Sequence, residues 1–209
     1  MSDDVSRETQ AATTARSHWP DTYAQLERYH HWLITAGVAR GLVGPREIER
    51  MWDRHINNSA VIGEAIPQGA SVLDVGSGAG LPGIPLAIVR PDLKVSLLEP
   101  LARRVEFLEE VVADLGITVQ VLRGRSEDLK GSTFDVVTGR AVAALNKLLP
   151  LSWHLVAEGG QVLAIKGAQA EAEIEEARSF LRKKKLNAEV LTVGSGVVEP
   201  LTTLVRVTA

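Results

Sequence analysis

Residues 72–83 read Val-Leu-Asp-Val-Gly-Ser-Gly-Ala-Gly-Leu-Pro-Gly, an apolar run that leads straight into a glycine-rich turn. Apolar, β-branched residues are typical of a covered parallel strand, and Gly76 begins the turn at a point where a side chain would block a ligand. Pro82 suits the first turn of a helix. The stretch therefore predicts a strand, a turn and a helix arranged so that a ligand can touch bare main chain.

An acidic residue follows the next predicted strand. Strand 94–98 leads to Glu99, which comes about 20 residues after the glycine turn, the separation at which a βαβ unit presents a carboxylate to ribose hydroxyls. Because Pro100 and Leu101 come next, Glu99 also suits a structural role beside the N-cap of a helix. We expect it to hydrogen-bond both hydroxyls of a ribose.

Two classes of ligand and one structural role are open for the turn. Gly78, Gly80 and Gly83 satisfy G-x-G-x-x-G, the dinucleotide fingerprint, in which the helix N-terminus holds a pyrophosphate. The spacing D-x-G-x-G-x-G from Asp74 instead resembles motif I of class I methyltransferases, which bind S-adenosylmethionine. That ligand carries an ammonium and a sulfonium but no phosphate, so Asp74 favours it over a pyrophosphate. The third alternative is a turn that only lets helix and strand pack closely.

The composition limits the class of protein. The chain has 209 residues, 45% of them hydrophobic, which can bury one substantial core. It has no cysteine, which excludes disulfides, thiolate metal clusters and a cysteine nucleophile, and is compatible with a reducing cytosol. The net charge of −3 argues against indiscriminate coating of nucleic acid, although it allows a local basic patch. No apolar run approaches the roughly 18 residues of a membrane span, and we expect a cytoplasmic protein.

Strands and helices alternate from residue 71 onward, which predicts an α/β fold with a mostly parallel, seven-stranded sheet. The predicted strands lie at 71–75, 94–98, 118–122, 134–138, 161–165, 188–193 and 201–207, and the last two form a closing antiparallel hairpin. The predicted helices of this part lie at 82–89, 101–114, 144–157 and 169–184.

The rest of the chain precedes the first strand. Residues 1–17 are polar without apolar periodicity and predict a disordered leader. Residues 18–66 contain two helical patterns and predict an N-terminal helical cap on the domain at 67–209.

Six segments, at 52–59, 74–88, 103–108, 124–128, 136–145 and 163–167, carry longer motifs such as Trp-Asp-Arg-His and Gly-Arg-Ser-Glu-Asp. Together they resemble the bacterial small-subunit ribosomal RNA guanine-N7 methyltransferases, the RsmG family, also called glucose-inhibited division protein B. The resemblance covers roughly residues 20–207, and Gly-Pro-Arg-Glu at 44–47 looks like actinobacterial members.

The resemblance implies a class I S-adenosylmethionine-dependent methyltransferase with a Rossmann-like fold. It further implies that the methyl group goes to N7 of one guanine, guanine 527 in the usual numbering, of 16S rRNA. By motif matching, Gly76 and Leu81 would line the cofactor, Ser126 and Glu127 would flank the adenine, and Arg140 would lie beside cofactor and substrate. Gly78 of the turn and Glu99 after the second strand complete the expected cofactor-binding residues. Many members have alanine at the position of Ser126 and a bulkier aromatic residue at that of Leu81, so main-chain contact is better supported than side-chain packing on the adenine.

Arg140 is the candidate catalytic residue. Guanine N7 has an exposed lone pair and no hydrogen, so in-line methyl transfer needs alignment and relief of positive charge but no general base. A guanidinium can donate to guanine O6 and leave N7 free for the methyl group. Two other methylation reactions lack their characteristic residues in this chain. Methylation of exocyclic amines often uses an Asn/Asp-Pro-Pro-aromatic loop, and methylation of cytosine C5 needs a cysteine nucleophile.

Candidates for RNA contact are Arg54, Asn57, Arg125 and Lys166. Lys166 follows an apolar strand and suits either an RNA phosphate or plain solvent exposure. His55 lies on an apolar helical face and suits a core histidine better than a catalyst, and the four tryptophans suit the core better than base stacking. The five histidines show no metal-ligand spacing, so we expect no metal site.

Two other functions remain open on the residues alone. The first is a methyltransferase for another RNA or for a small metabolite, and for a metabolite we would expect a closed apolar pocket over the cofactor. The second is a non-catalytic cofactor-binding RNA module, which would bind cofactor and RNA without transferring a methyl group. For the leading function, the expected partner is 16S rRNA or the small ribosomal subunit, with no membrane. We expect a monomer because no long amphipathic seam is left over.

Overall fold

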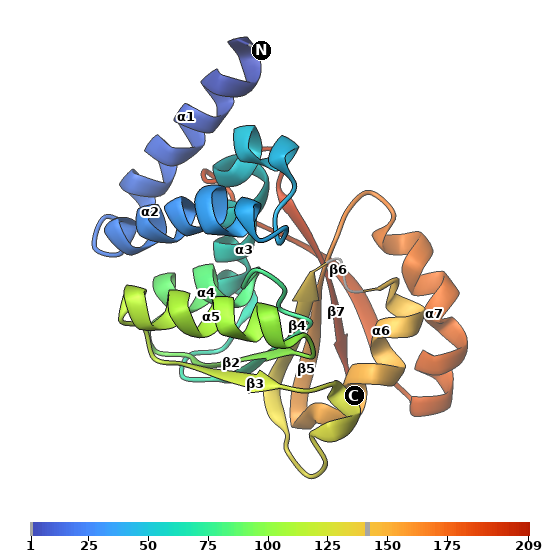
Figure 1. The fold of residues 1–209 in the computed structure, drawn as a ribbon. Helices are drawn as coiled ribbons and strands as arrows, with labels where there is room; N and C mark the ends of the chain where they lie inside the picture. The colour runs from blue at the N-terminus through green and yellow to red at the C-terminus, as the bar shows by residue number, and fades with distance from the viewer. Residues whose placement is uncertain (1, 141–142) are drawn as a thin grey trace.

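One seven-stranded sheet forms the centre of the molecule, as the computed structural model shows for residues 2–140 and 143–209 (Figure 1). The strand order is β3-β2-β1-β4-β5-β7-β6. Parallel pairing joins β1 (Ser71–Val75), β2 (Lys94–Glu99), β3 (Val119–Arg123), β4 (Phe134–Arg140) and β5 (Val156–Lys166). The order reverses between β1 and β4, and ligands of such sheets bind outside the carboxyl ends of the strands at this point.

The last two strands complete the sheet. β7 (Thr202–Thr208) runs antiparallel to both β5 and β6 (Asn187–Val193). The predicted closing hairpin is therefore confirmed.

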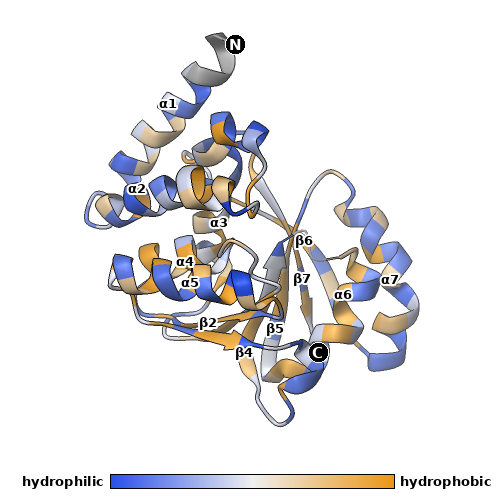
Figure 2. Ribbon diagram, in the orientation of Figure 1, coloured by the Kyte–Doolittle hydropathy of each residue, from blue (hydrophilic) through white to orange (hydrophobic). Residues whose placement is uncertain are grey.

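Two pairs of helices cover the two faces of the sheet (Figure 1). α4 (Gly83–Val89) and α5 (Ala102–Leu115) pack on one face, and α6 (Leu145–Ser152) and α7 (Ala170–Lys184) on the other. Figure 2 shows apolar strands between helices whose outer faces are hydrophilic. Because each of these helices has an apolar inner face and a polar outer face, helical periodicity in the sequence predicted the bounds of α5 and α7 closely.

The predicted helix at 144–157 is wrong at its C-terminal end. α6 ends at Ser152, the short helix η6 (Trp153–Leu155) follows, and β5 already begins at Val156. Val156 pairs with Phe134 of β4, and the register shifts before the main ladder of β5 begins. Pairing with a neighbouring strand thus overrides the local helical pattern.

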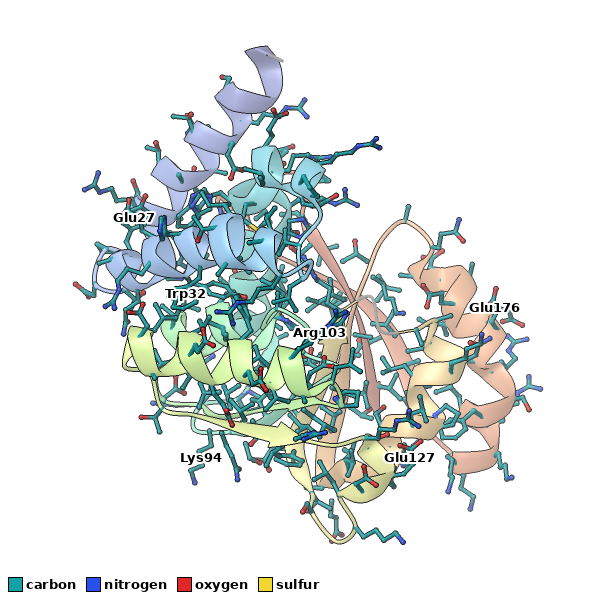
Figure 3. All side chains as sticks on the ribbon, in the orientation of Figure 1. Glu27, Trp32, Lys94, Arg103, Glu127 and Glu176 are labelled. Atoms are coloured by element: carbon teal, nitrogen blue, oxygen red, sulfur yellow. The ribbon has the colours of Figure 1, made fainter. Side chains whose placement is uncertain are left out.

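The helices that precede the sheet form a cap on α4 and α5. The first runs from α2 (Tyr23–Trp32) into η1 (Leu33–Gly37), and the second region comprises η2 (Pro45–Arg50), η3 (Met51–Ile56), α3 (Asn57–Ala60) and η4 (Val61–Ala65). The cap shares one hydrophobic core with the sheet. Trp52 stacks on Tyr23 with ring centroids 5.5 Å apart, and Trp32, labelled in Figure 3, packs edge-on against Phe107, as expected for core tryptophans.

The prediction of a disordered leader is wrong for residues 2–17, while residue 1 lies outside the described residues. Helix α1 (Ser2–His18) projects from the cap at the top of Figure 1. Ala11 and Ala15 are buried against the cap, and the Glu8 carboxylate accepts hydrogen bonds from the amides of Trp52, at 2.7 Å, and Asp53, at 3.2 Å. Two small residues one helical turn apart gave too weak a periodic signal to reveal this docking. No helix in the described part of the chain is long and apolar enough to cross a membrane.

Candidate active site

The glycine-rich turn leaves β1 and is held by main-chain hydrogen bonds. The amides of Gly76 and Ser77 both donate to the carbonyl of Leu98 in β2, at 2.8 and 3.1 Å. The φ angles of Gly76, Gly78 and Gly80 are 70°, 60° and 99°, values that residues with a side chain rarely adopt. The path of the turn therefore requires glycine and leaves its backbone uncovered.

Two side chains from other elements fix the outer part of the turn. The buried Tyr29 hydroxyl of α2 donates to the carbonyl of Ala79 at 2.8 Å. Glu99 Oε2 accepts from the amide of Gly78 at 3.0 Å, and Glu99 Oε1 accepts from the amide of Leu101 at 3.1 Å. Glu99 is only 1% exposed and joins the turn to the start of α5. Its structural role is confirmed, whereas contact with a ribose stays a prediction.

Asp74 lies within β1, beneath the turn. Its Oδ2 accepts a hydrogen bond from the amide of Gly83 at 3.0 Å, and its Oδ1 has no partner among the described residues. Burial raises the pKa of Asp74 to about 7, against the smaller opposing effect of the Gly83 amide. The carboxyl therefore titrates near neutral pH, and a cation bound at the turn would favour its charged form.

A cavity of about 200 Å³ opens beside the turn. On one side it is lined by Gly76, Ser77, Gly78, Ala79 and Leu81, and on the other by the cap residues Leu42, Val43, Gly44, Glu47, Met51 and His55, with Arg140 completing the wall. The structure thus brings four predicted site residues together in one place: Gly76, Gly78, Leu81 and Arg140.

Arg140 ends β4 at the boundary of this cavity. Its Nη2 lies 2.6 Å from His55 Nδ1, and its Nη1 donates to the carbonyl of Arg54 at 3.3 Å. No ion pair in the described parts of the chain includes Arg140, and burial lowers the pKa of its guanidinium. A desolvated cation without an acidic partner is costly, so an electron-rich ligand would stabilise this arrangement.

Arg140 also faces a second cavity. This open space of about 490 Å³ is lined by Arg140, Ala143, Ala144, Ile165, Lys166, Gly167 and Glu173. Arg140 therefore borders both the cavity of the glycine turn and a separate recess at the ends of β4 and β5.

The two predicted adenine contacts lie on η5 (Ser126–Asp128), after β3. The segment starts near Glu99, because the amide of Gly124 donates to the Glu99 carbonyl at 3.2 Å. Ser126 is buried and Glu127 exposed, and neither lines the cavity beside the turn. Figure 3 shows Glu127 beside α6 and apart from Arg103 at the start of α5. Contact of Ser126 and Glu127 with an adenine stays a prediction.

The four candidates for RNA contact differ in exposure. The Arg54 side chain is 57% exposed, with Glu47 at 3.7 Å, and Arg125 is exposed on the loop after β3. Both are accessible to a large ligand. RNA contact by these two residues stays a prediction.

The other two candidates are corrected by the structure. Asn57 is fully buried beneath α1 and donates from Nδ2 to the Ala11 carbonyl at 3.0 Å, so the prediction of RNA contact is wrong. The Lys166 side chain is 9% exposed, lies 2.7 Å from Glu173 and donates to the Ala143 carbonyl at 2.9 Å. The alternative of plain solvent exposure is therefore wrong, whereas contact of Lys166 with an RNA phosphate stays a prediction.

Sequence reasoning missed the part of the site that comes from the cap. Glu47, Met51 and the loop at 42–44 line the cavity, and Tyr29 holds the turn, although only an apolar helical face was recognised in this region. The joint position of Met51 and His55 on one helical face was the available signal. Periodicity shows which face is apolar but not which distant loop it meets.

The described residues also form a cavity away from the glycine turn. A larger cavity of about 630 Å³ lies at the amino ends of the strands, among Pro67, Asp135, Gln161 and Arg206, and is not formed by the glycine turn. Within residues 2–140 and 143–209, no group of three histidine, aspartate or glutamate side chains could hold a metal ion.

The reversed strand order, the glycine turn after β1 and the acidic residue at the end of β2 define a class I methyltransferase. The family model GidB, described as rRNA small subunit methyltransferase G, matches residues 22–200, and the chain belongs to this family. The resemblance read from the six motifs is thereby confirmed.

Individual relatives agree with this membership. The protein of Thermobifida fusca (strain YX) named Ribosomal RNA small subunit methyltransferase G is 53% identical over 197 residues, which cover 93% of this chain and 83% of that protein. The protein of the same name from Streptomyces coelicolor is 53% identical over 199 residues, covering 92% and 82%. The crystal structure of ribosomal protein L11 methylase from Lactobacillus delbrueckii subsp. bulgaricus, 17% identical, superposes with a TM-score of 0.56 and covers 79% of each chain, which shows the shared fold.

Proposed function

We propose that this chain transfers a methyl group from S-adenosylmethionine to N7 of one guanine in 16S rRNA, guanine 527 in the usual numbering. The observation that carries the proposal is Arg140, whose desolvated guanidinium forms no ion pair within the described residues and which lines the same cavity as the glycine turn. Family membership supports the substrate class. The naked RNA or the assembled small subunit is the partner, and we place the reaction in the cytoplasm, with the protein acting as a monomer.

The residues of the turn fit S-adenosylmethionine. The uncovered main chain of Gly76, Gly78 and Leu81 would contact the cofactor, and Glu99 would bind its ribose. Asp74 supplies negative charge under the turn, which suits an ammonium and a sulfonium and opposes a pyrophosphate. When bound, the cofactor supplies the electrophilic methyl group. The second part of the binding surface, Ser126 and Glu127, would flank the adenine.

The geometry around Arg140 suits N7 chemistry. A guanidinium that donates to guanine O6 orients the base and leaves the N7 lone pair free. Because N7 carries no proton, the site has only to align the two reactants and exclude water. The position of Arg140 between two cavities allows it to touch cofactor and base together.

The proposal is tested by transfer of a tritiated methyl group into ribosomal RNA from cells that lack this protein. Small subunits and naked 16S rRNA are offered separately, and the labelled nucleoside is identified. We expect 7-methylguanosine at a single position. Label in another nucleoside, or binding of cofactor without transfer, would contradict the proposal.

Glu99→Ala is expected to raise the dissociation constant of S-adenosylmethionine at least tenfold. A charged acceptor of hydrogen bonds contributes about 1.5–3 kcal/mol, and each 1.4 kcal/mol is tenfold in affinity. Calorimetric titration measures the effect, and Glu158→Ala, which changes an exposed carboxylate of β5 outside the cavity and the proposed binding surface, gives the comparison. Unchanged affinity in Glu99→Ala would argue against the ribose contact.

The affinity for S-adenosylmethionine is expected to rise with pH between 6 and 7.5, by up to about tenfold. Asp74 has a pKa raised to about 7, so it is largely protonated at the lower pH. A cationic ligand binds the charged carboxylate better, and binding therefore releases a proton. Titrations in buffers of different ionisation enthalpy detect that proton, and Asp74→Asn should abolish both its release and the pH dependence.

A further inference from the structure

His55 joins Arg140 to an acidic residue of the cap. His55 Nδ1 lies 2.6 Å from Arg140 Nη2, and His55 Nε2 lies 2.6 Å from Glu47 Oε2. A guanidinium can only donate, so Nδ1 must be the acceptor, and the ring proton must then be on Nε2 and donated to Glu47. The three side chains come from η2, η3 and β4.

We infer that His55, oriented by Glu47, is a positioning residue that fixes the Arg140 guanidinium between the cofactor and the target base. The inference rests on the proposed function, because it concerns the residue assigned there to guanine O6. It goes further in giving the cap a direct part in the reaction.

The surroundings support a neutral imidazole. Burial lowers the pKa of His55, and the charge of Arg140 lowers it further, while the hydrogen bond from His55 to Glu47 opposes both. Arg54 adds positive charge from the same helix, and Glu47 is the acidic group that contacts the ring. Tyr29 and Asp74 interact with the guanidinium from α2 and β1. His55 is thus set to remain a hydrogen-bond acceptor at neutral pH.

Protonation of His55 would reverse this arrangement. An imidazolium has no acceptor nitrogen, so its Nδ1–H would face the N–H groups of Arg140 and two positive charges would lie side by side. Arg140 would lose its side-chain partner and its fixed direction. Methyl transfer should therefore decline on the acidic side of the profile as His55 gains a proton.

The packing around η3 explains how such a contact can be held. The Glu8 carboxylate of α1 accepts hydrogen bonds from the amides of Trp52 and Asp53 at the start of η3. The Arg140 guanidinium also donates to the Arg54 carbonyl of the same helix. The helix that carries His55 is therefore fixed at its start by α1 and further along by β4.

His55→Ala is expected to lower kcat about 10- to 100-fold, with the KM for S-adenosylmethionine changed less than about threefold, because orientation is lost and cofactor contacts remain. His55→Asn places an amide oxygen near the former Nδ1 and should restore much of kcat. Because an amide does not gain a proton in this pH range, the decline of kcat at acidic pH that His55 causes should disappear. Exposed His31→Ala is the matched control and should behave like the unaltered protein.

The pH profile of kcat at saturating cofactor separates positioning from general folding. Glu47→Gln removes the charge that favours the imidazolium, so the acidic limb should move to lower pH while the fold persists, as melting temperature reports. This variant also decides the matter if His55→Ala fails to fold. Identical acidic limbs in the unaltered protein and Glu47→Gln, or native kcat in folded His55→Ala, would overturn the inference. No methyl transfer by the unaltered protein would instead overturn the proposed function.

Discussion

Arg140→Ala is expected to lower kcat/KM for methyl transfer by about 100- to 1000-fold, the usual cost of removing one preorganised donor from a reaction site. Arg140 lines both the cavity of the glycine turn and the recess at the ends of β4 and β5. Its fixed contacts are the neutral His55 ring and the Arg54 carbonyl. Because Arg140 forms no ion pair in the part of the chain that the structure describes, removing this desolvated cation should change the free energy of unfolding by less than about 1 kcal/mol, or even raise it.

Activity and stability are measured on the same variants to separate these effects. Single-turnover transfer of a tritiated methyl group reports the chemistry, and urea unfolding reports the stability. Arg140→Lys retains the charge but loses the planar pair of donors, so it should remain strongly impaired. Arg178→Ala changes an arginine 56% exposed on α7 and should leave both quantities unchanged. A native rate for Arg140→Ala would remove Arg140 from the mechanism.

The sheet and the turn were predictable because their signals are local. The apolar run, the alternating glycines and Glu99 lie within one βαβ unit, and each is specified by its immediate neighbours. Arg140 followed from the rule that ligands bind at the carboxyl ends of parallel strands. Predicting these parts of the site required only the order of the strands and helices along the chain.

The cap was harder to predict because its contacts join residues far apart in the sequence. His55 meets Arg140, and Asn57 lies beneath α1, although each was judged by the pattern of its own helix alone. Lys166, which ends a strand, was expected either to meet an RNA phosphate or to be solvent exposed, but Glu173 of α7 pairs with it. Periodicity establishes that a face is buried, whereas the identity of the partner depends on the assembled fold.

Gly83→Ala is expected to lower the free energy of unfolding by about 3 kcal/mol, which for a chain of this size lowers the melting temperature by about 6–12 °C. Gly83 begins α4 at the point where the helix approaches β1 and β2. An added Cβ would lie 2.9 Å from Asp74 Oδ2 and would overlap the buried Leu97 side chain. Relief of this overlap must move α4 away from the strands, and the Gly83 amide would then lose its hydrogen bond to Asp74.

Gly167→Ala provides the matched comparison for this prediction. Gly167 follows β5 near the same end of the sheet, but a Cβ there meets no heavy atom within 4 Å. Its melting temperature should stay within about 2 °C of the unaltered protein. Cofactor affinity should also separate the two variants, because only Gly83→Ala displaces the helix that follows the turn. Equal melting temperatures would show that the sheet and α4 accommodate a methyl group at Gly83, and that glycine is not required at this position for close packing.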